Sequence, residues 1–148
     1  MSKGKTSKRV LVLDDEPEYL EWVKDYLEAE GMKVEYVRTL REALKAIAFG
    51  GEYRLLLVDM NVPDDGAIEP GIRERTPLVT KYPGLVLAIE ARNRGYGAHS
   101  VIAYTVHDDD AADAELQRLR CRYVLKGRPE VLKRVVQSSL RPAPLKSP

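Results

Sequence analysis

Acidic side chains follow two of the most apolar runs in the sequence. Asp14 and Asp15 come directly after residues 10–13, and Asp59 comes directly after residues 55–58. Both runs contain only Val and Leu, which is typical of strands covered on both faces of a parallel sheet. Because the carboxyl ends of parallel strands meet at one edge, the three carboxylates are expected to converge there. Their mutual repulsion favours a hard divalent cation such as Mg²⁺; the alternative is a polar rim of exposed acids without a metal.

Two further polar residues end later apolar runs. Thr105 follows residues 101–104, and Lys126 follows residues 123–125. A hydroxyl and an ammonium that face a metal–carboxylate cluster suit a phosphoryl group, since each can hold an oxygen that the cation does not. Taken singly, the hydroxyl is more typical of a turn and the lysine of a structural ion pair. Together with the three acids, they favour a phosphoryl site.

The elements that must position these residues alternate along the chain. Strands are expected over 10–13, 33–38, 55–58, 101–104 and 123–125, and helices over 17–30, from 40 to Gly50 or Gly51, and over 85–94, 108–120 and 129–140. Five β-α units with right-handed crossovers predict an α/β fold with helices on both faces of a parallel sheet. The most apolar runs belong in its centre, which favours a doubly wound, flavodoxin-like, five-stranded sheet of order 2-1-3-4-5.

Charge and composition exclude several classes of protein. The chain has 24 basic and 23 acidic side chains, but its two ends are basic, so that residues 10–140 hold 18 basic against 23 acidic ones. This balance argues against a direct nucleic-acid binder. The single cysteine cannot form an internal disulfide, and no apolar run approaches the length of a membrane span or a secretory signal. A cytoplasmic protein with no membrane insertion is therefore expected.

The chain is expected to divide into a basic disordered tail over 1–8, one domain over 9–140, and a Pro-rich tail over 141–148. Within the domain, the Pro- and Gly-rich stretch that ends near residue 84 shows no pattern of secondary structure. About residues 67–84 are interpreted as an insertion. It is either a partner-recognition loop or flap, or a surface insertion that the fold tolerates.

The polar motifs, taken in order, resemble the receiver domain of two-component response regulators, of the single-domain chemotaxis type. They are D-D-E-P at 14–17, D-M-N-V-P at 59–63 followed by Gly66, then Thr105, and Y-V-L-K at 123–126. The resemblance covers about residues 9–140. It implies a phosphorylation switch that receives its phosphoryl group from a histidine kinase or a phosphotransfer protein and acts on an unknown downstream protein.

The resemblance also implies roles for the residues of the site. Asp59 would be the phosphoacceptor, a carboxylate nucleophile. Asp14 and Asp15 would hold Mg²⁺ with Asp59 and the backbone carbonyl of Asn61. Lys126 would pair first with Asp59 and then with a phosphoryl oxygen.

Other positions would couple the site to the surface or tune its rates. Thr105 would turn toward the phosphoryl group, and Tyr123 would follow into the space it leaves, although Tyr123 is also readily explained as an ordinary strand aromatic. Asn61, Val106 and His107 lie where the family tunes dephosphorylation.

Two positions beside the site depart from the family pattern. Val106 is larger than the usual alanine. Lys126 is followed by Gly127-Arg128 where the family has proline, so the local turn should differ.

Three functions remain open on these residues. The first is a stand-alone response regulator that catalyses only its own phosphorylation and dephosphorylation. The second is a Mg²⁺-dependent phosphohydrolase that uses Asp59, although no substrate pocket is evident from the sequence. The third is a phosphorylation-independent adaptor, which would have no need for the five polar residues.

Overall fold

The computed structural model describes residues 3–106 and 108–141; of Tyr19 it describes only the backbone. The strands are β1 (Arg9–Leu13), β2 (Lys33–Val37), β3 (Leu55–Asp59), β4 (Val101–Thr105) and β5 (Arg122–Leu125). The α-helices are α1 (Glu21–Ala29), α2 (Leu40–Phe49), α3 (Pro70–Arg75), α4 (Leu85–Asn93), α5 (Asp110–Arg118) and α6 (Pro129–Leu140). Short 3-10 helices cover Pro17–Leu20, Pro77–Thr80 and Ala98–Ser100.

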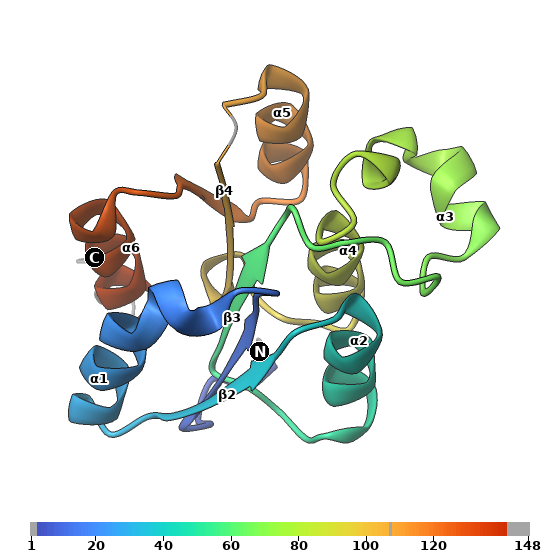
Figure 1. The fold of residues 1–148 in the computed structure, drawn as a ribbon. Helices are drawn as coiled ribbons and strands as arrows, with labels where there is room; N and C mark the ends of the chain where they lie inside the picture. The colour runs from blue at the N-terminus through green and yellow to red at the C-terminus, as the bar shows by residue number, and fades with distance from the viewer. Residues whose placement is uncertain (1–2, 107, 142–148) are drawn as a thin grey trace, which may run out of the picture.

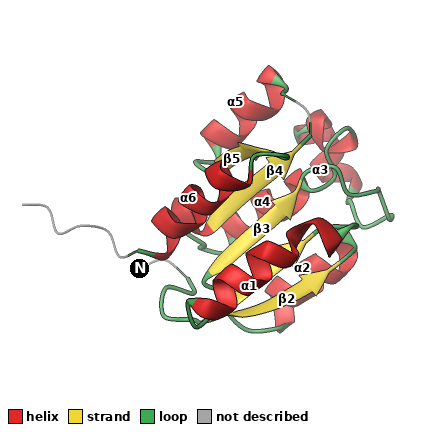
Figure 2. Cartoon of the chain, turned by 60° about the vertical axis from the view of Figure 1, so that its left-hand side comes forward, coloured by secondary structure: helices red, strands yellow, loops and turns green. Residues whose placement is uncertain are grey.

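The strands form one parallel sheet of order β2-β1-β3-β4-β5, which confirms the predicted fold. The sheet lies between two layers of helices (Figures 1 and 2). Side chains of α1 and α6 pack on one face, and side chains of α2, α4 and α5 pack on the other. This double cover explains why the central strands could be recognised as unbroken apolar runs.

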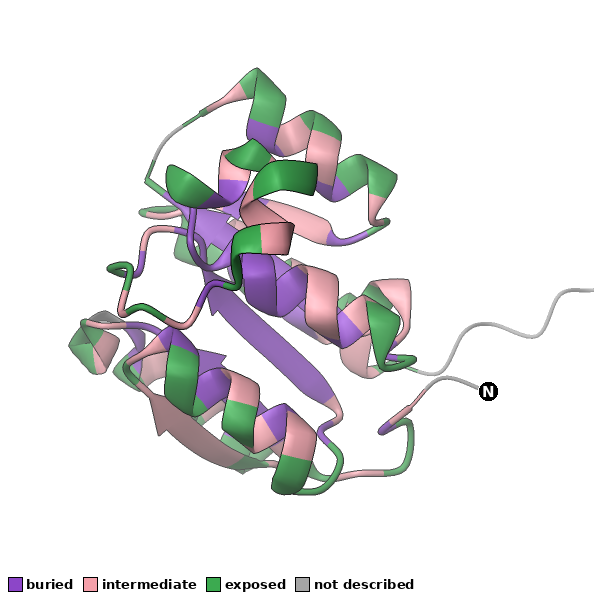
Figure 3. Cartoon of the chain, turned by 90° about the vertical axis from the view of Figure 1, so that its right-hand side faces the viewer, coloured by how far each residue is buried: buried purple, intermediate pink, exposed green. Residues whose placement is uncertain are grey.

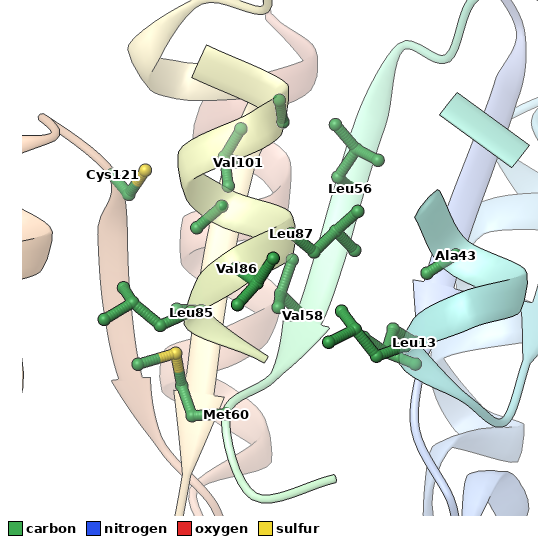
Figure 4. Close-up of a cluster of buried hydrophobic side chains, with 14 of the residues drawn as sticks. Leu13, Ala43, Leu56, Val58, Met60, Leu85, Val86, Leu87, Val101 and Cys121 are labelled. Carbon is green, nitrogen blue, oxygen red and sulfur yellow. The ribbon is translucent and has the colours of Figure 1, made fainter. Parts of the chain in front are cut away.

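Burial follows the two faces of the sheet. Every residue of β3 and β4 is buried, whereas β2 at the edge is only partly covered (Figure 3). Leu56 and Val58 face α2 and α4, whereas Leu55 and Leu57 face α1 and α6, as the period of a strand requires. Figure 4 shows part of the main apolar cluster, which lies between the sheet and α2, α4 and α5, with Met60 beneath the start of α4.

Side-chain caps set two of the helix starts. Thr39 accepts a hydrogen bond from the Glu42 N–H at 3.1 Å and begins α2. Asp109 accepts from the N–H groups of Ala111 and Ala112, so α5 begins at Asp110 rather than at the predicted Asp108.

The stretch over 67–84 is not structureless, so that prediction is wrong. It holds α3 and the 3-10 helix Pro77–Thr80, and proline stands in the first turn of each. Ile68, Val79 and Tyr82 are buried in the main apolar cluster, and this packing orders the stretch.

Residues 3–8, expected to belong to a disordered tail, contact the body of the domain in the structure. The Lys3 N–H donates to the Gly95 carbonyl at 3.0 Å, and a parallel bridge joins Lys3 to Tyr96. Gly4 is buried with a φ of 77°, where a Cβ would lie 1.8 Å from the Tyr53 carbonyl oxygen, so only glycine allows this path. The remaining residues of the two expected tails, 1–2 and 142–148, lie outside the described residues.

Among the described residues, none of the helices is long and apolar enough to cross a membrane.

Candidate functional site

The ends of β1 and β3 bring three carboxylates together. Leu13 pairs with Val58 in the sheet, so Asp14, directly after β1, and Asp59, the last residue of β3, lie at the same level. Oxygen atoms of Asp14, Asp15 and Asp59 lie within 4.8 Å of one another. Asp14 and Asp59 are each 1% exposed, and Asp15 is half-buried. The structure thus places the three acids at the one edge of the sheet where the sequence predicted them.

The two oxygens of the Asp59 carboxylate have different partners. Its Oδ1 accepts the Asn61 N–H at 2.9 Å. Its buried Oδ2 forms an ion pair with Lys126 Nζ at 3.1 Å and accepts no hydrogen bond of good geometry from the described residues. Burial raises the pKa of Asp59 to about 6, against the lowering effects of the Asn61 N–H and the Lys126 ammonium. A buried, unsatisfied carboxylate oxygen beside two other acids fits a cation with oxygen ligands.

Asp14 has hydrogen bonds on both of its oxygens. Its Oδ1 accepts the Glu16 N–H at 2.7 Å, and its Oδ2 accepts the Tyr104 hydroxyl at 2.7 Å. Burial and the nearby Asp14 raise the pKa of Tyr104 well above its usual value, so the phenol stays a neutral donor. Tyr104 was not predicted from the sequence as a residue of the site. Its position in β4, two residues after Ile102, places it on the same face of the sheet as Asp59 and would have been the signal.

Lys126 reaches the acids from the end of β5. Its ammonium lies 3.1 Å from Asp59 and 3.8 Å from Asp14, and its side chain is 24% exposed. Its backbone N–H donates to the Thr105 carbonyl at 2.7 Å, which fixes the start of the loop that follows. Gly127 then turns the chain with a φ of 85°, a conformation that favours glycine over the proline of the family pattern.

Thr105 lies at the other side of the site. Its buried hydroxyl donates to the side-chain oxygen of Asn61. Tyr123 is half-buried and packs with the cluster beneath α4 and α5, on the face of the sheet toward which Thr105 also points. Val106 is 61% exposed, and His107 lies outside the described residues.

A second residue that the sequence analysis missed is Gly84. A Cβ on it would lie 2.0 Å from the Asp59 carbonyl oxygen, so glycine is required where α4 begins against the end of β3. Gly66, which the sequence motif included, lies in an exposed turn where the nearest atom to a Cβ is on Arg41, 3.7 Å away. The sequence signal for Gly84 was the Pro83-Gly84 pair directly before a helical stretch.

The end of the 67–84 stretch is bonded to the loop between β4 and α5. Tyr82 Oη donates to Asp109 Oδ2 at 2.6 Å, and Lys81 Nζ lies 3.0 Å from the same oxygen. These donors lower the pKa of Asp109. The stretch is therefore tied to the loop that carries Val106.

A cavity of about 580 Å³ opens beside the acids, between the starts of the 3-10 helix before α1 and of α6. Asp14, Tyr104 and Lys126 line it together with apolar side chains that include Trp22 and Leu132. No substrate pocket was evident from the sequence, and the cavity appears only in the folded structure. The cavity is lined by three separate stretches of the chain, within 14–22, 104–106 and 124–132, and only the fold determines that they lie close together.

No family model matches the chain, and no curated protein matches it. Solved structures do. A two-component response regulator from Clostridium difficile is 18% identical over 90% of this chain and 95% of its own, with a TM-score of 0.67. A response regulator receiver domain protein from Methanospirillum hungatei is 23% identical over 88% and 92%, with a TM-score of 0.64.

The response regulator TrrA from Thermotoga maritima, in complex with Mg²⁺ and BeF, is 27% identical over 90% of this chain and 98% of its own, with a TM-score of 0.59. The sheet order, the placement of the helices and these likenesses agree over nearly the whole chain. The protein has the fold of the receiver domains of response regulators.

Proposed function

We propose that the protein is a response regulator that accepts a phosphoryl group on Asp59, in a Mg²⁺-dependent reaction, from a histidine kinase or a phosphotransfer protein. One observation carries the proposal. Asp59 Oδ2 is buried, accepts no hydrogen bond of good geometry from the described residues, and forms an ion pair with an ammonium 3.1 Å away at the edge of an acid cluster. A nucleophilic oxygen needs this combination of a free lone pair and a nearby positive charge.

The donor set suits the metal. Asp14, Asp15 and Asp59 offer carboxylate oxygens within one small region, and the backbone carbonyl of Asn61 would complete the protein ligands. Mg²⁺ binds oxygen ligands and keeps places for water and a phosphate oxygen. When bound, it would offset the charge of the acids and of the incoming phosphoryl group.

Side chains of the protein would then carry out the phosphoryl transfer and hold the transferred group. Asp59 Oδ2 forms the bond to phosphorus while the bond from phosphorus to the donor's imidazole nitrogen breaks and that nitrogen keeps the electron pair. Lys126 moves from Asp59 to a phosphoryl oxygen, which needs little displacement from 3.1 Å. Before it can hold another oxygen, the Thr105 hydroxyl must leave Asn61.

The signal would leave the site through Thr105. A new bond from its hydroxyl draws the end of β4 toward the site, and Tyr123 follows on the same face of the sheet. The surface formed by α4, β5 and α5 then changes for a downstream protein. Asn61, Val106 and His107 would tune the lifetime of the phosphoryl group; the bond from Thr105 to Asn61 links the first of these directly to the switch.

A Mg²⁺-dependent phosphohydrolase is a second candidate because the cavity of about 580 Å³ adjoins Asp14 and Lys126. A volume of this size can hold a small ligand. In such an enzyme Asp59 would serve the same nucleophilic role, but the covalent intermediate would turn over on a specific substrate.

One experiment separates the candidates. The protein is incubated with Mg²⁺ and acetyl phosphate, and covalent phosphate is measured by intact mass over time, next to Asp59→Ala and Asp25→Ala. Asp25 is an exposed acid of α1 outside the site and serves as the matched control. We expect an adduct in the wild type and in Asp25→Ala and none in Asp59→Ala.

Two other outcomes contradict the proposal. Rapid turnover of a phosphoester without a lasting adduct favours the hydrolase. No adduct and no turnover in any of the three proteins favours the phosphorylation-independent adaptor.

A further inference from the structure

Tyr104 is a polar side chain in an apolar part of the core. It is 1% exposed and packs in the cluster that α1 and α6 cover, next to Ile102 and Val124. In the sheet it pairs with Asp59, so its side chain leaves β4 level with the proposed phosphoacceptor. A phenylalanine would fill the same space without a hydroxyl to satisfy, so the hydroxyl needs its own explanation.

The hydroxyl is bound to an acid of the site. It lies 2.7 Å from Asp14 Oδ2 and 3.2 Å from the Leu13 carbonyl oxygen. It has one proton to donate, and the charged carboxylate at the shorter distance is the stronger acceptor. With the Glu16 N–H on Oδ1, both oxygens of Asp14 are fixed, and the carboxylate cannot rotate without losing a hydrogen bond.

Tyr104 also affects which acid Lys126 contacts. The ammonium lies 5.0 Å from the centre of the tyrosine ring, 3.1 Å from Asp59 and 3.8 Å from Asp14. Asp14 is 1% exposed, so without the tyrosine hydroxyl its Oδ2 would need another donor. The nearest charged donor is Lys126, which would then leave Asp59 for Asp14.

From these contacts we infer that Tyr104 is a positioning residue of the cation site: its hydroxyl orients Asp14 toward the metal and keeps Lys126 directed at Asp59. This inference rests on the proposed function, because it concerns the same cation. Tyr104 does not touch the reacting atoms itself. It acts by holding a ligand, as hydrogen-bond partners of metal ligands do.

The change that tests it is Tyr104→Phe, which keeps the ring in its apolar cluster and removes only the hydroxyl. Loss of such a partner typically weakens metal binding about 10–100-fold. We therefore expect the Mg²⁺ dissociation constant, measured by calorimetry at neutral pH, to rise by about that factor. Trp22, the single tryptophan, lines the same cavity and gives a second readout by fluorescence.

Tyr96→Phe is the matched control. It removes another fully buried tyrosine hydroxyl, one that accepts the Tyr53 N–H at 3.1 Å near the opposite end of β3. The control should bind Mg²⁺ like the wild type. Thermal unfolding of both variants in EDTA verifies that they fold.

Phosphorylation kinetics distinguish a positioning role of Tyr104 from a general loss of structure. With acetyl phosphate as donor, the Mg²⁺ concentration for half-maximal phosphorylation of Tyr104→Phe should rise by the same factor as the dissociation constant. The rate at saturating Mg²⁺ should stay within about twofold of the wild type, because the metal, once bound, holds Asp14 itself.

Three outcomes overturn the inference. Equal or tighter Mg²⁺ binding in Tyr104→Phe, with a wild type that binds, refutes it and leaves the proposed function standing. Equal weakening in Tyr96→Phe shows a general structural effect and refutes it as well. A wild type that binds no Mg²⁺ refutes the proposed function and the inference with it.

Discussion

Replacing Asp59 by asparagine should stabilise the protein at neutral pH. Asp59 is 1% exposed, and one of its oxygens accepts no hydrogen bond of good geometry from the described residues. Burial raises the pKa of its carboxyl from 3.8 to about 6. At neutral pH the ionised carboxylate is therefore less stable in the folded chain than in the unfolded chain. Asparagine has nearly the same shape and no charge.

The size of the effect follows from the pKa. A difference of one pKa unit corresponds to 1.36 kcal/mol, so the rise to about 6 costs the folded wild type about 3 kcal/mol when Asp59 is ionised. Lys126 loses a partner in Asp59→Asn, which offsets part of the gain. Its side chain is 24% exposed and can turn to water or to Asp14, 3.8 Å away. We expect a net gain of about 1–3 kcal/mol in the free energy of unfolding.

The gain must depend on pH. Because the folded pKa is raised, the cost of the charge is fully present above about pH 6 and disappears as the pH falls toward 3.8, the value of the unfolded carboxyl. Asp59→Asn should therefore lose its advantage over the wild type between these two pH values. Taking the difference between the two proteins cancels the titration of the groups they share.

Urea unfolding in EDTA, at neutral pH and near pH 4, measures both proteins. Asp25→Asn on the exposed face of α1 is the control and should change little at either pH. A variant that is no more stable than the wild type at neutral pH, or an advantage that is the same at both pH values, would refute the account of the Asp59 environment.

Two substitutions test the packing around the site. Gly84→Ala should lower the free energy of unfolding by about 1–3 kcal/mol and slow phosphorylation, because its Cβ would stand 2.0 Å from the Asp59 carbonyl oxygen. Gly71→Ala in α3, whose Cβ would meet only the flexible end of Arg75 at 3.4 Å, is the control and should be neutral or slightly stabilising. Tyr82→Phe removes the 2.6 Å hydrogen bond to Asp109 and should lower the urea midpoint and speed amide exchange over residues 76–83; unchanged exchange would show that this bond does not hold the segment.

The sheet and the acid cluster were predictable from the sequence for a physical reason. Strands buried on both faces must be almost wholly apolar, so the carboxylates that end them stand out, and parallel strands carry their ends to one edge. Asp14, Asp15 and Asp59 needed only these two rules. Lys126 needed a third, that β5 joins the same sheet.

The segment over 67–84 was not predictable in the same way. α3 has six residues, too few for a helical period to show. Pro70 and Pro77 favour a loop as much as a first helical turn. What orders the segment is contact with distant parts of the chain: Val79 in the core and Tyr82 on Asp109. Such contacts depend on the folded arrangement.

Tyr104 shows a different limit. Its place on the Asp59 face follows from counting along β4, but its role depends on the hydroxyl reaching Asp14 on another strand. Polar residues at the ends of apolar strands stand out in a sequence, whereas a tyrosine within a strand does not.

The most direct test of the central claim is to locate the phosphoryl group. After incubation with Mg²⁺ and acetyl phosphate, borohydride reduces an aspartyl phosphate to homoserine, and peptide mass spectrometry identifies the altered position. The account predicts homoserine at residue 59 and its absence when Mg²⁺ is withheld. Homoserine at Asp14 or Asp15, or at no position although the protein is folded and binds Mg²⁺, would contradict it.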